Sequence, residues 1–211
     1  RDGGRRGNGE EARRESEQDE HFEGLELVQI EDVGGEDETP FALAVQPDRL
    51  GYAIYTSGYT GTAKGVGFSH EALLSHVQDA VGRFEITADD RIIQFSTLNF
   101  DGAVDQIFTA PSQGARLIVR GPELWDYETA TAQMMAQGAS IAYFPGGYFR
   151  EWAEHAAGDV QRLRLVMTGG EALPGASVKT WRDGLLGHVR LENRYGPTET
   201  TVTALTHETR C

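Results

Sequence analysis

The stretch Tyr55–Gly65, with the sequence YTSGYTGTAKG, follows the short apolar and aromatic run Leu50–Tyr55 (LGYAIY). A run of this composition predicts a buried strand. Beyond the stretch, Ser69 is a plausible helix N-cap. Apolar residues then recur at helical spacing, at Leu74, Val77, Val81 and Phe84. The sequence therefore predicts a strand, then a loop rich in glycine and hydroxyl groups, then a helix.

The loop has the composition of a polyphosphate-binding segment. Its glycines let backbone N–H groups come close to an anion, its threonines and serine add hydroxyl donors, and Lys64 adds a mobile positive charge. An ordinary turn explains the same composition, and the loop alone does not separate the two readings. A P-loop is disfavoured, because that motif needs Ser or Thr directly after Gly-Lys, whereas here Ala63 precedes Lys64 and Gly65 follows it.

Composition and charge exclude several classes of protein. The 211 residues suffice for one large domain, and 39% of them are hydrophobic. Residues 1–40 hold 14 acidic and 5 basic side chains, so they carry −9 of the net charge of −14. An acidic chain of this kind does not present a nucleic-acid surface. With Cys211 as the single cysteine and no apolar run long enough for a membrane span, we expect a soluble cytoplasmic protein that has no membrane partner.

The N-terminal part of the chain differs from the rest. Residues 1–20 contain one apolar side chain, Ala12, and are expected to form a disordered tail. Residues 21–32 predict a short strand, and residues 33–39 an acidic connection that Pro40 ends. From Leu50 onward the pattern becomes regular.

Strands and helices alternate over the remainder of the sequence. Strands are predicted at 91–96, 116–120, 140–144, 163–168 and 189–192, and helices at 103–108, 125–137, 148–157 and 177–186. This order predicts an α/β fold with a mostly parallel sheet flanked by helices.

Four loops with polar or glycine-rich sequences follow predicted strands, at 56–64, 99–102, 169–173 and 194–199. In open sheets of this kind, ligands bind beyond the carboxyl ends of the strands. We therefore expect the four loops to form one crevice.

Each of the later loops has its own chemistry. Asp101 suits a substrate ammonium, or else it caps the helix that begins near Gly102. The pair Gly169-Gly170 lets backbone approach a flat ligand, although a simple turn explains it as well. The run Tyr195–Glu199 (YGPTE) offers an aromatic face, a hydroxyl and a carboxylate. A carboxylate beside a phosphate needs a cation between them, and Mg²⁺ is the usual one for ATP.

Taken in order, these motifs resemble the adenylate-forming enzymes, and most closely the adenylation domains of nonribosomal peptide synthetases. The resemblance rests on the loop Tyr55–Gly65, on Asn99-Phe100-Asp101, on Gly169–Leu173 (GGEAL), and on Asn193 with Tyr195–Thr200 (YGPTET). It implies that residues 21–211 are a partial AMP-binding (adenylation) domain, namely the middle part of the large N-terminal domain of such an enzyme. An aspartate after Asn99-Phe100 favours members that activate amino acids.

The resemblance implies a function and site residues. The enzyme would use ATP and Mg²⁺ to convert an amino acid into an aminoacyl-adenylate, and would pass the acyl group to the phosphopantetheine thiol of a carrier protein. The catalytic residues would be Lys64, Thr198 and Glu199, with Glu199 also the metal ligand. The nucleotide would contact Thr56, Ser57, Gly58, Thr60, Gly61, Thr62, Lys64, Gly170, Glu171, Ala172, Asn193, Tyr195, Gly196 and Thr198.

The substrate side chain would lie in a pocket that begins at Asp101, which would bind the α-ammonium. The other pocket residues implied by the resemblance are Gly102, Asp105, Tyr143, Met167, Gly169, Arg194, Val202 and Thr203. Asp105 would favour a basic amino acid if it is unpaired, because a buried carboxylate needs a cationic partner. If Arg194 pairs with Asp105, the pocket is instead neutral and polar.

The sequence also departs from the family pattern. Tyr59 stands where the family usually has Ser, and Ala63 where it usually has Pro. The sequence ends at Cys211, before the segments that carry the family's ribose-binding aspartate and its mobile lysine. We therefore expect a truncated domain that is too short for full activity. Two alternatives remain: a catalytically inactive fragment that binds nucleotide or amino acid, and a fragment that does not fold by itself.

Overall fold

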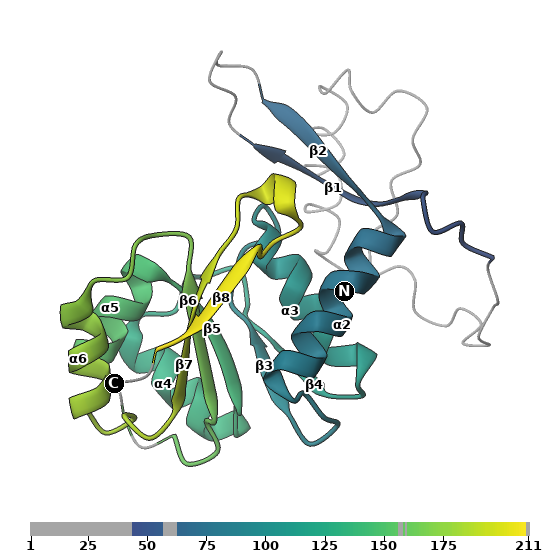
Figure 1. Ribbon diagram of the computed structural model, residues 1–211. Coiled ribbons are helices and arrows are strands. Elements are labelled where there is room, and N and C mark those ends of the chain that lie inside the picture. The colour runs from purple at the N-terminus through teal and green to yellow at the C-terminus, as the bar shows by residue number, and fades with distance from the viewer. Residues whose placement is uncertain (1–43, 57–62, 156–157, 159, 210–211) are drawn as a thin grey trace, which may run out of the picture. The chain divides into compact units, whose positions relative to one another are not determined.

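The computed structural model describes residues 44–56, 63–155, 158 and 160–209 (Figure 1). The chain divides into two units, Arg1–Ala44 and Val45–Cys211, and all described residues except Ala44 belong to the second. The predicted tail at 1–20, strand at 21–32 and connection at 33–39 lie outside the described residues.

A six-stranded sheet with the order β4-β3-β5-β6-β7-β8 forms the centre of this unit. Its strands are β3 (Arg91–Gln94), β4 (Arg116–Val119), β5 (Ile141–Pro145), β6 (Leu165–Gly169), β7 (Arg190–Tyr195) and β8 (Leu205–Glu208). The first five strands pair in parallel, whereas β8 pairs antiparallel with β7. The predicted mostly parallel α/β sheet is confirmed, and β8 is an edge strand that the sequence did not reveal.

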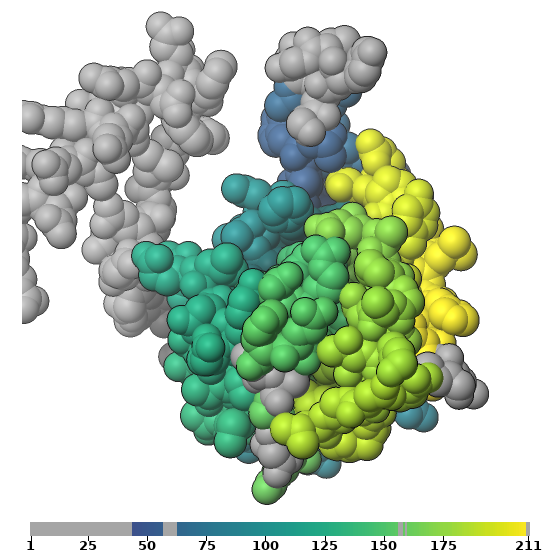
Figure 2. All heavy atoms as spheres, turned by 90° about the vertical axis from the view of Figure 1, so that its left-hand side faces the viewer, coloured from purple at the N-terminus to yellow at the C-terminus, as the bar shows by residue number. Residues whose placement is uncertain are grey.

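Helices cover both faces of the sheet because successive strand residues point to opposite sides. On one face, α2 (His70–Phe84) and α3 (Asp101–Ser112) pack in a cluster with Ile92, Ile141 and Leu165. On the other face, α4 (Tyr127–Gln137), α5 (Gly146–His155) and α6 (Gly175–Asp183) pack in a cluster with Ile93, Ala142 and Val166. Figure 1 shows the two groups of helices on either side of the sheet, and Figure 2 shows the atoms of the second group covering it.

The helix ends follow local sequence signals. Ser69 caps α2 as predicted, since its hydroxyl accepts a hydrogen bond from the Ala72 N–H at 3.2 Å. Asp126 caps α4 in the same way, and Gly138 ends it with a φ of 63°. No described helix is long and apolar enough to cross a membrane.

The core face of α2 differs from the one that the spacing suggested. Leu73, Val77, Ala80 and Phe84 are buried, whereas Leu74 is 56% exposed. Both sets of residues have helical spacing, so the pattern fixed the helix but left its rotation open by one residue. Ala80 is small and was not among the apolar residues used to predict the helix, although it is buried in the core cluster under α2.

The strand at Leu50–Thr56, β1, is present but is not a buried strand of the main sheet. It pairs antiparallel with β2 (Lys64–Ser69) in a separate two-stranded sheet. Only Ile54 of β1 is buried, and Tyr52 stacks on Phe68 of β2 with ring centroids 4.6 Å apart. The predicted order of strand, loop and helix is therefore wrong in one respect, because a second strand stands between the loop and α2.

Several predicted boundaries shift by a few residues. β6 begins at Leu165 instead of residue 163, α6 ends at Asp183 instead of residue 186, and α5 begins at Gly146 instead of residue 148. Residues 156 and 157, the predicted end of α5, lie outside the described residues. The short 3-10 helix η3 (Thr198–Thr200) was not predicted.

Candidate functional site

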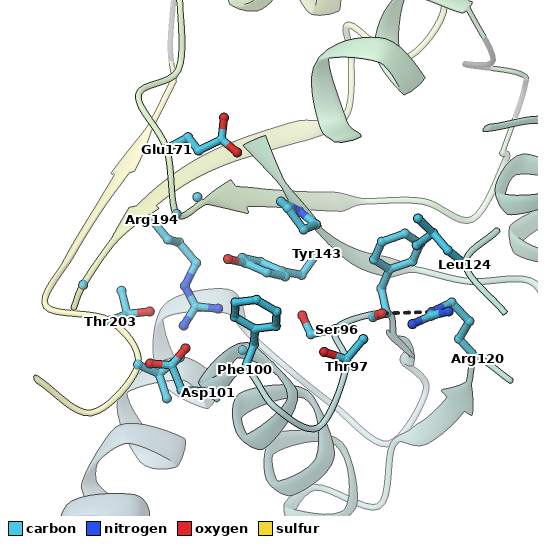
Figure 3. Close-up of a pocket in the computed structure, with 17 residues that line it drawn as sticks. Ser96, Thr97, Phe100, Asp101, Arg120, Leu124, Tyr143, Glu171, Arg194 and Thr203 are labelled. Atoms are coloured by element: carbon cyan, nitrogen blue, oxygen red, sulfur yellow. Dashed lines mark hydrogen bonds between the residues drawn. The ribbon is translucent and has the colours of Figure 1, made fainter. Parts of the chain in front are cut away.

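A cavity of about 350 Å³ lies at the carboxyl ends of the parallel strands (Figure 3). Its walls come from the residues after β3, β4, β6 and β7, from the end of β5, and from the first turn of α3. The residues that line it are Phe95, Ser96, Thr97, Phe100, Asp101, Gly102, Arg120, Leu124, Tyr143, Pro145, Gly169, Gly170, Glu171, Arg194, Gly196, Val202 and Thr203. Cavities of this size accommodate small molecules.

Three of the four predicted loops contribute to this cavity, namely those that begin near residues 99, 169 and 194. The fourth, at 56–64, does not follow a strand of the main sheet, because it connects β1 to β2. Its residues Ser57, Gly58, Thr60, Gly61 and Thr62 lie outside the described part of the chain. The prediction of one crevice is therefore confirmed for three loops and stays a prediction for the fourth.

The structure places the predicted site residues in two groups. Those that line the cavity are Asp101, Gly102, Tyr143, Gly169, Gly170, Glu171, Arg194, Gly196, Val202 and Thr203. The described residues that were predicted for the site but do not line the cavity are Thr56, Lys64, Asp105, Met167, Ala172, Asn193, Tyr195, Thr198 and Glu199. Of this second group, Asp105 and Met167 lie directly behind the cavity wall, where both contact Arg194.

Sequence reasoning missed seven of the lining residues. Phe95, Ser96 and Thr97 follow β3, and Arg120 follows β4. Their position at the carboxyl ends of predicted strands was the signal that would have found them. Leu124 and Pro145 complete this set, together with Phe100, which lies in the predicted loop 99–102 but was given no role in the site.

Hydrogen bonds from α3 and from Arg120 hold the loop after β3 in place. The Gln106 carboxamide oxygen accepts from the backbone N–H groups of Phe95 and Ser96 at 2.9 and 3.2 Å. Arg120 Nε donates to the Phe95 carbonyl oxygen at 3.0 Å, the dashed bond in Figure 3. This part of the wall is therefore fixed by buried side chains rather than by the loop alone.

Asp101 is a buried carboxylate with unused hydrogen-bonding capacity. It is the first residue of α3, while Phe100 occupies the N-cap position and makes no side-chain capping bond, so the capping interpretation of Asp101 is wrong. Its Oδ2 is buried and has no hydrogen-bond partner among the described residues. Burial raises the pKa of Asp101, and the hydrogen bonds from the Thr198 side chain and the Gly102 N–H, with the charges of Arg194 and His76, offset this only in part. A cationic ligand would satisfy this carboxylate.

Asp105, one turn further along α3, has the opposite environment. Its Oδ1 lies 2.7 Å from His76 Nε2 and its Oδ2 lies 2.7 Å from Arg194 Nη1. Although burial by itself raises the pKa of Asp105, the charge of Arg194 and the hydrogen bonds from His76 and Arg194 bring it well below its usual range. Of the two alternatives for the pocket, the structure thus shows the one in which Arg194 pairs with Asp105.

Tight turns shape the strip of backbone after β6 and β7. Gly170 has a φ of 79°, which glycine adopts without strain. A Cβ on Gly196 would lie 2.6 Å from the Val202 carbonyl oxygen, because the chain folds back over it. Thr201 and Val202 also have positive φ values, which β-branched residues rarely adopt. Glycines and residues with positive φ therefore form the turns that bring the backbone after β6 and β7 to the edge of the cavity.

Two side chains of the YGPTE run, Tyr195 and Glu199, are exposed, whereas Gly196 of the same run lines the cavity. Tyr195 is 65% exposed, and Glu199 is exposed in η3. Among the described residues, no group of three or more His, Cys, Asp or Glu side chains could hold a metal ion. A single exposed carboxylate suits Mg²⁺ that is held mainly by the phosphates of a nucleotide, so Glu199 fits a metal that arrives with ATP.

Comparisons with known proteins agree with this architecture. The profile of the family described as "AMP-binding enzyme" matches residues 6–211. Over 160 residues the chain is 38% identical to the isonitrile lipopeptide synthase of Streptomyces coeruleorubidus. This match covers 74% of the present chain and 11% of the synthase. The chain thus spans about a tenth of the length of this relative.

Solved structures share the fold at lower identity. The nonribosomal peptide synthetase FmoA3 matches 90% of this chain and 21% of its own, with a TM-score of 0.78 and 23% identity. PA1221, described as a synthetase protein containing adenylation and PCP domains, matches 89% of this chain and 37% of its own, with a TM-score of 0.74 and 22% identity. The chain belongs to the family of AMP-binding enzymes, and it shares its fold with nonribosomal peptide synthetases such as FmoA3 and PA1221.

Proposed function

We propose that this chain binds an α-amino acid and ATP and takes part in forming the aminoacyl-adenylate. The observation that carries the proposal is Asp101, whose buried Oδ2 lacks a partner in the described part of the chain and which lines the cavity. A substrate α-ammonium supplies the missing positive charge. Aryl and fatty acids have no ammonium group, so they would leave the Asp101 carboxylate buried and unpaired, which costs binding free energy.

In the proposed reaction, a carboxylate oxygen of the amino acid attacks the α-phosphorus of ATP. The new P–O bond forms as the bond to the β-phosphate breaks, and pyrophosphate leaves with the electron pair. The chain performs no covalent step here, so its contribution is to hold the two substrates in line and to balance their charges. Asp101 fixes the amino end of the substrate, and the cavity receives its side chain.

The nucleotide is proposed to lie along the backbone that borders the cavity. Gly170, Glu171 and Ala172 would flank the adenine, and the exposed ring of Tyr195 would stack on it. Asn193 and Gly196 belong to the same strip. The loop that includes Thr56 and Lys64, together with Thr198, would contact the phosphates.

Glu199 is proposed to hold Mg²⁺, which would neutralise phosphate charge when bound. Glu199→Gln should weaken binding of Mg-ATP about tenfold or more and leave adenosine binding nearly unchanged, because only the charged ligand depends on the metal. Isothermal titration with each ligand measures this. Equal weakening of both ligands would show that Glu199 has a structural role.

The acyl group is proposed to pass to the phosphopantetheine thiol of a carrier protein. PA1221, which has this fold, is described as containing adenylation and PCP domains in one protein. The amino acid and the carrier are therefore the partners proposed for this chain.

The proposal is tested with aminoacyl-sulfamoyl-adenosines, which mimic the adenylate and resist hydrolysis. The chain should bind such an analogue on the order of 100-fold more tightly than the matched analogue without its α-amino group, since the latter leaves Asp101 unpaired. Asp101→Asn should abolish most of this preference. The control is Asp89→Asn, because Asp89 is exposed and remote from the cavity lining.

Equal binding of the two analogues would contradict the role of Asp101. Binding without amino-acid-dependent exchange of pyrophosphate into ATP would favour the second candidate, a module that binds nucleotide and amino acid without turnover. That candidate has the same cavity, so only the exchange assay separates the two.

A further inference from the structure

Arg194 belongs to a buried network that extends from α2 to the cavity. His76 on α2 lies against Asp105 on α3, and Asp105 lies against Arg194 on β7, with both polar distances at 2.7 Å. The side chains of His76, Asp105 and Arg194 are 8%, 6% and 4% exposed. An ionised carboxylate only accepts hydrogen bonds, so His76 Nε2 carries the proton that it donates to Asp105. This bond orients the carboxylate and thereby fixes the guanidinium.

The guanidinium of Arg194 retains donors that no described residue uses. Its Nη1 donates to Asp105, and Met167 Sδ lies 3.5 Å from the same nitrogen. Its Nε is buried without a partner within the described ranges. The rings of Phe84 and Tyr143 lie 5.6 and 5.8 Å from the guanidinium carbon, so aromatic walls keep it in place.

Arg194 also lines the cavity, together with Gly102, Tyr143 and Gly169. Figure 3 shows Arg194 and Tyr143 extending toward one another, with Asp101 below the guanidinium of Arg194 in this view. Asp101 and Arg194 line the same cavity, and Gly102 leaves space beside Ser96 and Tyr143. A ligand held by its ammonium at Asp101 can therefore direct its side chain to the guanidinium.

The charges around this space are balanced once an ammonium group is bound at Asp101. Asp105 neutralises Arg194, and a substrate ammonium would neutralise Asp101. A basic side chain would face the guanidinium, and an acidic one would bring a further negative charge beside Asp101 without a cation of its own. An apolar side chain would leave the buried Nε–H group unpaired, which costs binding free energy.

We propose that Arg194 is the specificity-determining residue of this site, and that the substrate is an α-amino acid whose uncharged side chain ends in a hydrogen-bond-accepting oxygen, such as a carboxamide. Asp105 and His76 are its positioning residues. This inference rests on the proposed function, because it assumes that the cavity binds an amino acid.

The test measures how this chain binds matched pairs of aminoacyl-sulfamoyl-adenosines by isothermal titration. The pairs differ in the oxygen: glutaminyl against methionyl, asparaginyl against leucyl, and tyrosyl against phenylalanyl. In the pair that binds most tightly, the oxygen-bearing member should bind on the order of 100-fold more tightly than its partner. It should also exceed the glutamyl and lysyl analogues.

Five outcomes would count against the proposals, four of them against the inference alone and one against the proposed function. Equal binding within each pair, or tighter binding of the apolar members, would overturn the inference while leaving the proposed function intact. Tightest binding of the lysyl or of the glutamyl analogue would overturn the neutral-pocket inference in the same way. Failure of every analogue to bind would overturn the proposed function itself.

Two variants separate a specificity role of Arg194 from a structural one. Arg194→Lys keeps a positive charge beside Asp105 but loses the Nε–H donor, so the discrimination should fall at least about tenfold. The double variant Asp105→Leu/Arg194→Met replaces the buried pair by apolar side chains, a change that folded proteins tolerate. It should reverse the preference within each pair toward the apolar member. Unchanged discrimination in both folded variants would overturn the inference.

The matched control is Arg190→Lys. Arg190 also belongs to β7 and also pairs with a buried carboxylate, since its Nε donates to Glu192 Oε1 at 2.9 Å. It does not line the cavity. This variant should lower stability without changing the discrimination between paired analogues, so a change equal to that in Arg194→Lys would show that the effect is structural.

Discussion

The parallel strands begin at one edge of the sheet, here the first edge, and end at the opposite one, the second edge. Buried polar groups are paired within the protein at the first edge, whereas several are unpaired at the second. At the edge where the strands begin, Asp90 accepts four hydrogen bonds: two from Arg164 at 2.9 and 2.8 Å, one from the Ser140 hydroxyl at 2.7 Å and one from the Thr87 N–H at 2.9 Å. At the edge where the strands end, Asp101 Oδ2, Arg194 Nε and Thr168 Oγ1 are all buried without a partner among the described residues.

This difference separates stability from binding. Asp90, Ser140 and Arg164 stand just before β3, β5 and β6, so their bonds connect three parallel strands. Buried polar groups are normally satisfied within the protein. Asp101 and Arg194, each with an unpaired buried atom, both line the cavity, so the missing partner there is expected to be a ligand. The first edge holds the sheet together and the second is available for chemistry.

The largest effect is expected at the first edge. Asp90→Ala should lower the free energy of unfolding by about 2–4 kcal/mol, because it leaves Arg164 and the Ser140 hydroxyl without their carboxylate. Urea denaturation measures the change. The control is Asp89→Ala. Asp89 is the exposed neighbour of Asp90, so its replacement should change the free energy of unfolding by less than about 0.5 kcal/mol. Equal effects would mean that the Asp90 cluster does not stabilise the sheet.

The second edge should respond in the opposite direction. Asp101→Asn removes a buried negative charge that the chain does not fully compensate, so it should raise the free energy of unfolding by up to about 1 kcal/mol. The same denaturation experiment measures it in the absence of ligand. A loss of stability comparable to that in Asp90→Ala would show that Asp101 has a structural partner.

A pair of hydroxyl substitutions sharpens the comparison. Ser140→Ala should cost about 1–2 kcal/mol, since the Ser140 hydroxyl donates to Asp90 and accepts from the Arg91 N–H at 2.9 Å. Thr168→Val keeps the side-chain shape and removes an unpaired hydroxyl, so it should change the free energy of unfolding by less than about 0.5 kcal/mol or raise it. If Thr168→Val lowers the free energy of unfolding as much as Ser140→Ala does, the two edges do not differ in how their hydroxyl groups are paired.

Part of the contribution of Asp90 to stability depends on its ionisation. Burial of Asp90 opposes ionisation, but the hydrogen bonds and charge of Arg164, with those from Thr87 and Ser140, lower its pKa to about 2. A lowered carboxyl pKa stabilises the fold above the unfolded-state pKa of about 3.9, and this stabilisation is lost as the pH falls toward 2.

The difference in unfolding free energy between wild type and Asp90→Asn should therefore shrink from about pH 5 to about pH 3. Asp101 has the opposite sign, because its raised pKa means that ionisation costs stability at higher pH. The difference between wild type and Asp101→Asn should thus also approach zero on acidification, but from the destabilised side. Parallel pH series of urea denaturation measure both trends, and a constant Asp90 difference would contradict the linkage.

Much of the fold followed from the sequence pattern. The alternation of apolar strands with helical segments predicted the mostly parallel sheet, and residues such as Ser69 and Gly138 marked helix ends through local backbone chemistry. The hairpin of β1 and β2 did not follow, because an apolar run such as Leu50–Tyr55 has the same appearance in a central strand and in a separate two-stranded sheet. Pairing partners decide between these, and they are not local.

The candidate site shows the same division. The sequence by itself determined that glycine turns and polar side chains follow the strands, since strand ends and turn residues are encoded by near neighbours. It also predicted a helix at 103–108 that contains Asp105, with Asp101 just before it, and the structure places both on α3. It did not determine which of the two carboxylates is free. Tertiary structure decided this, because Asp105 is bound by His76, 29 residues before it, and by Arg194, 89 residues after it, whereas Oδ2 of Asp101 meets no such partner in the described residues. The charge that a buried carboxylate meets depends on which distant strands and helices pack beside it, and only the folded chain brings those groups within hydrogen-bonding distance.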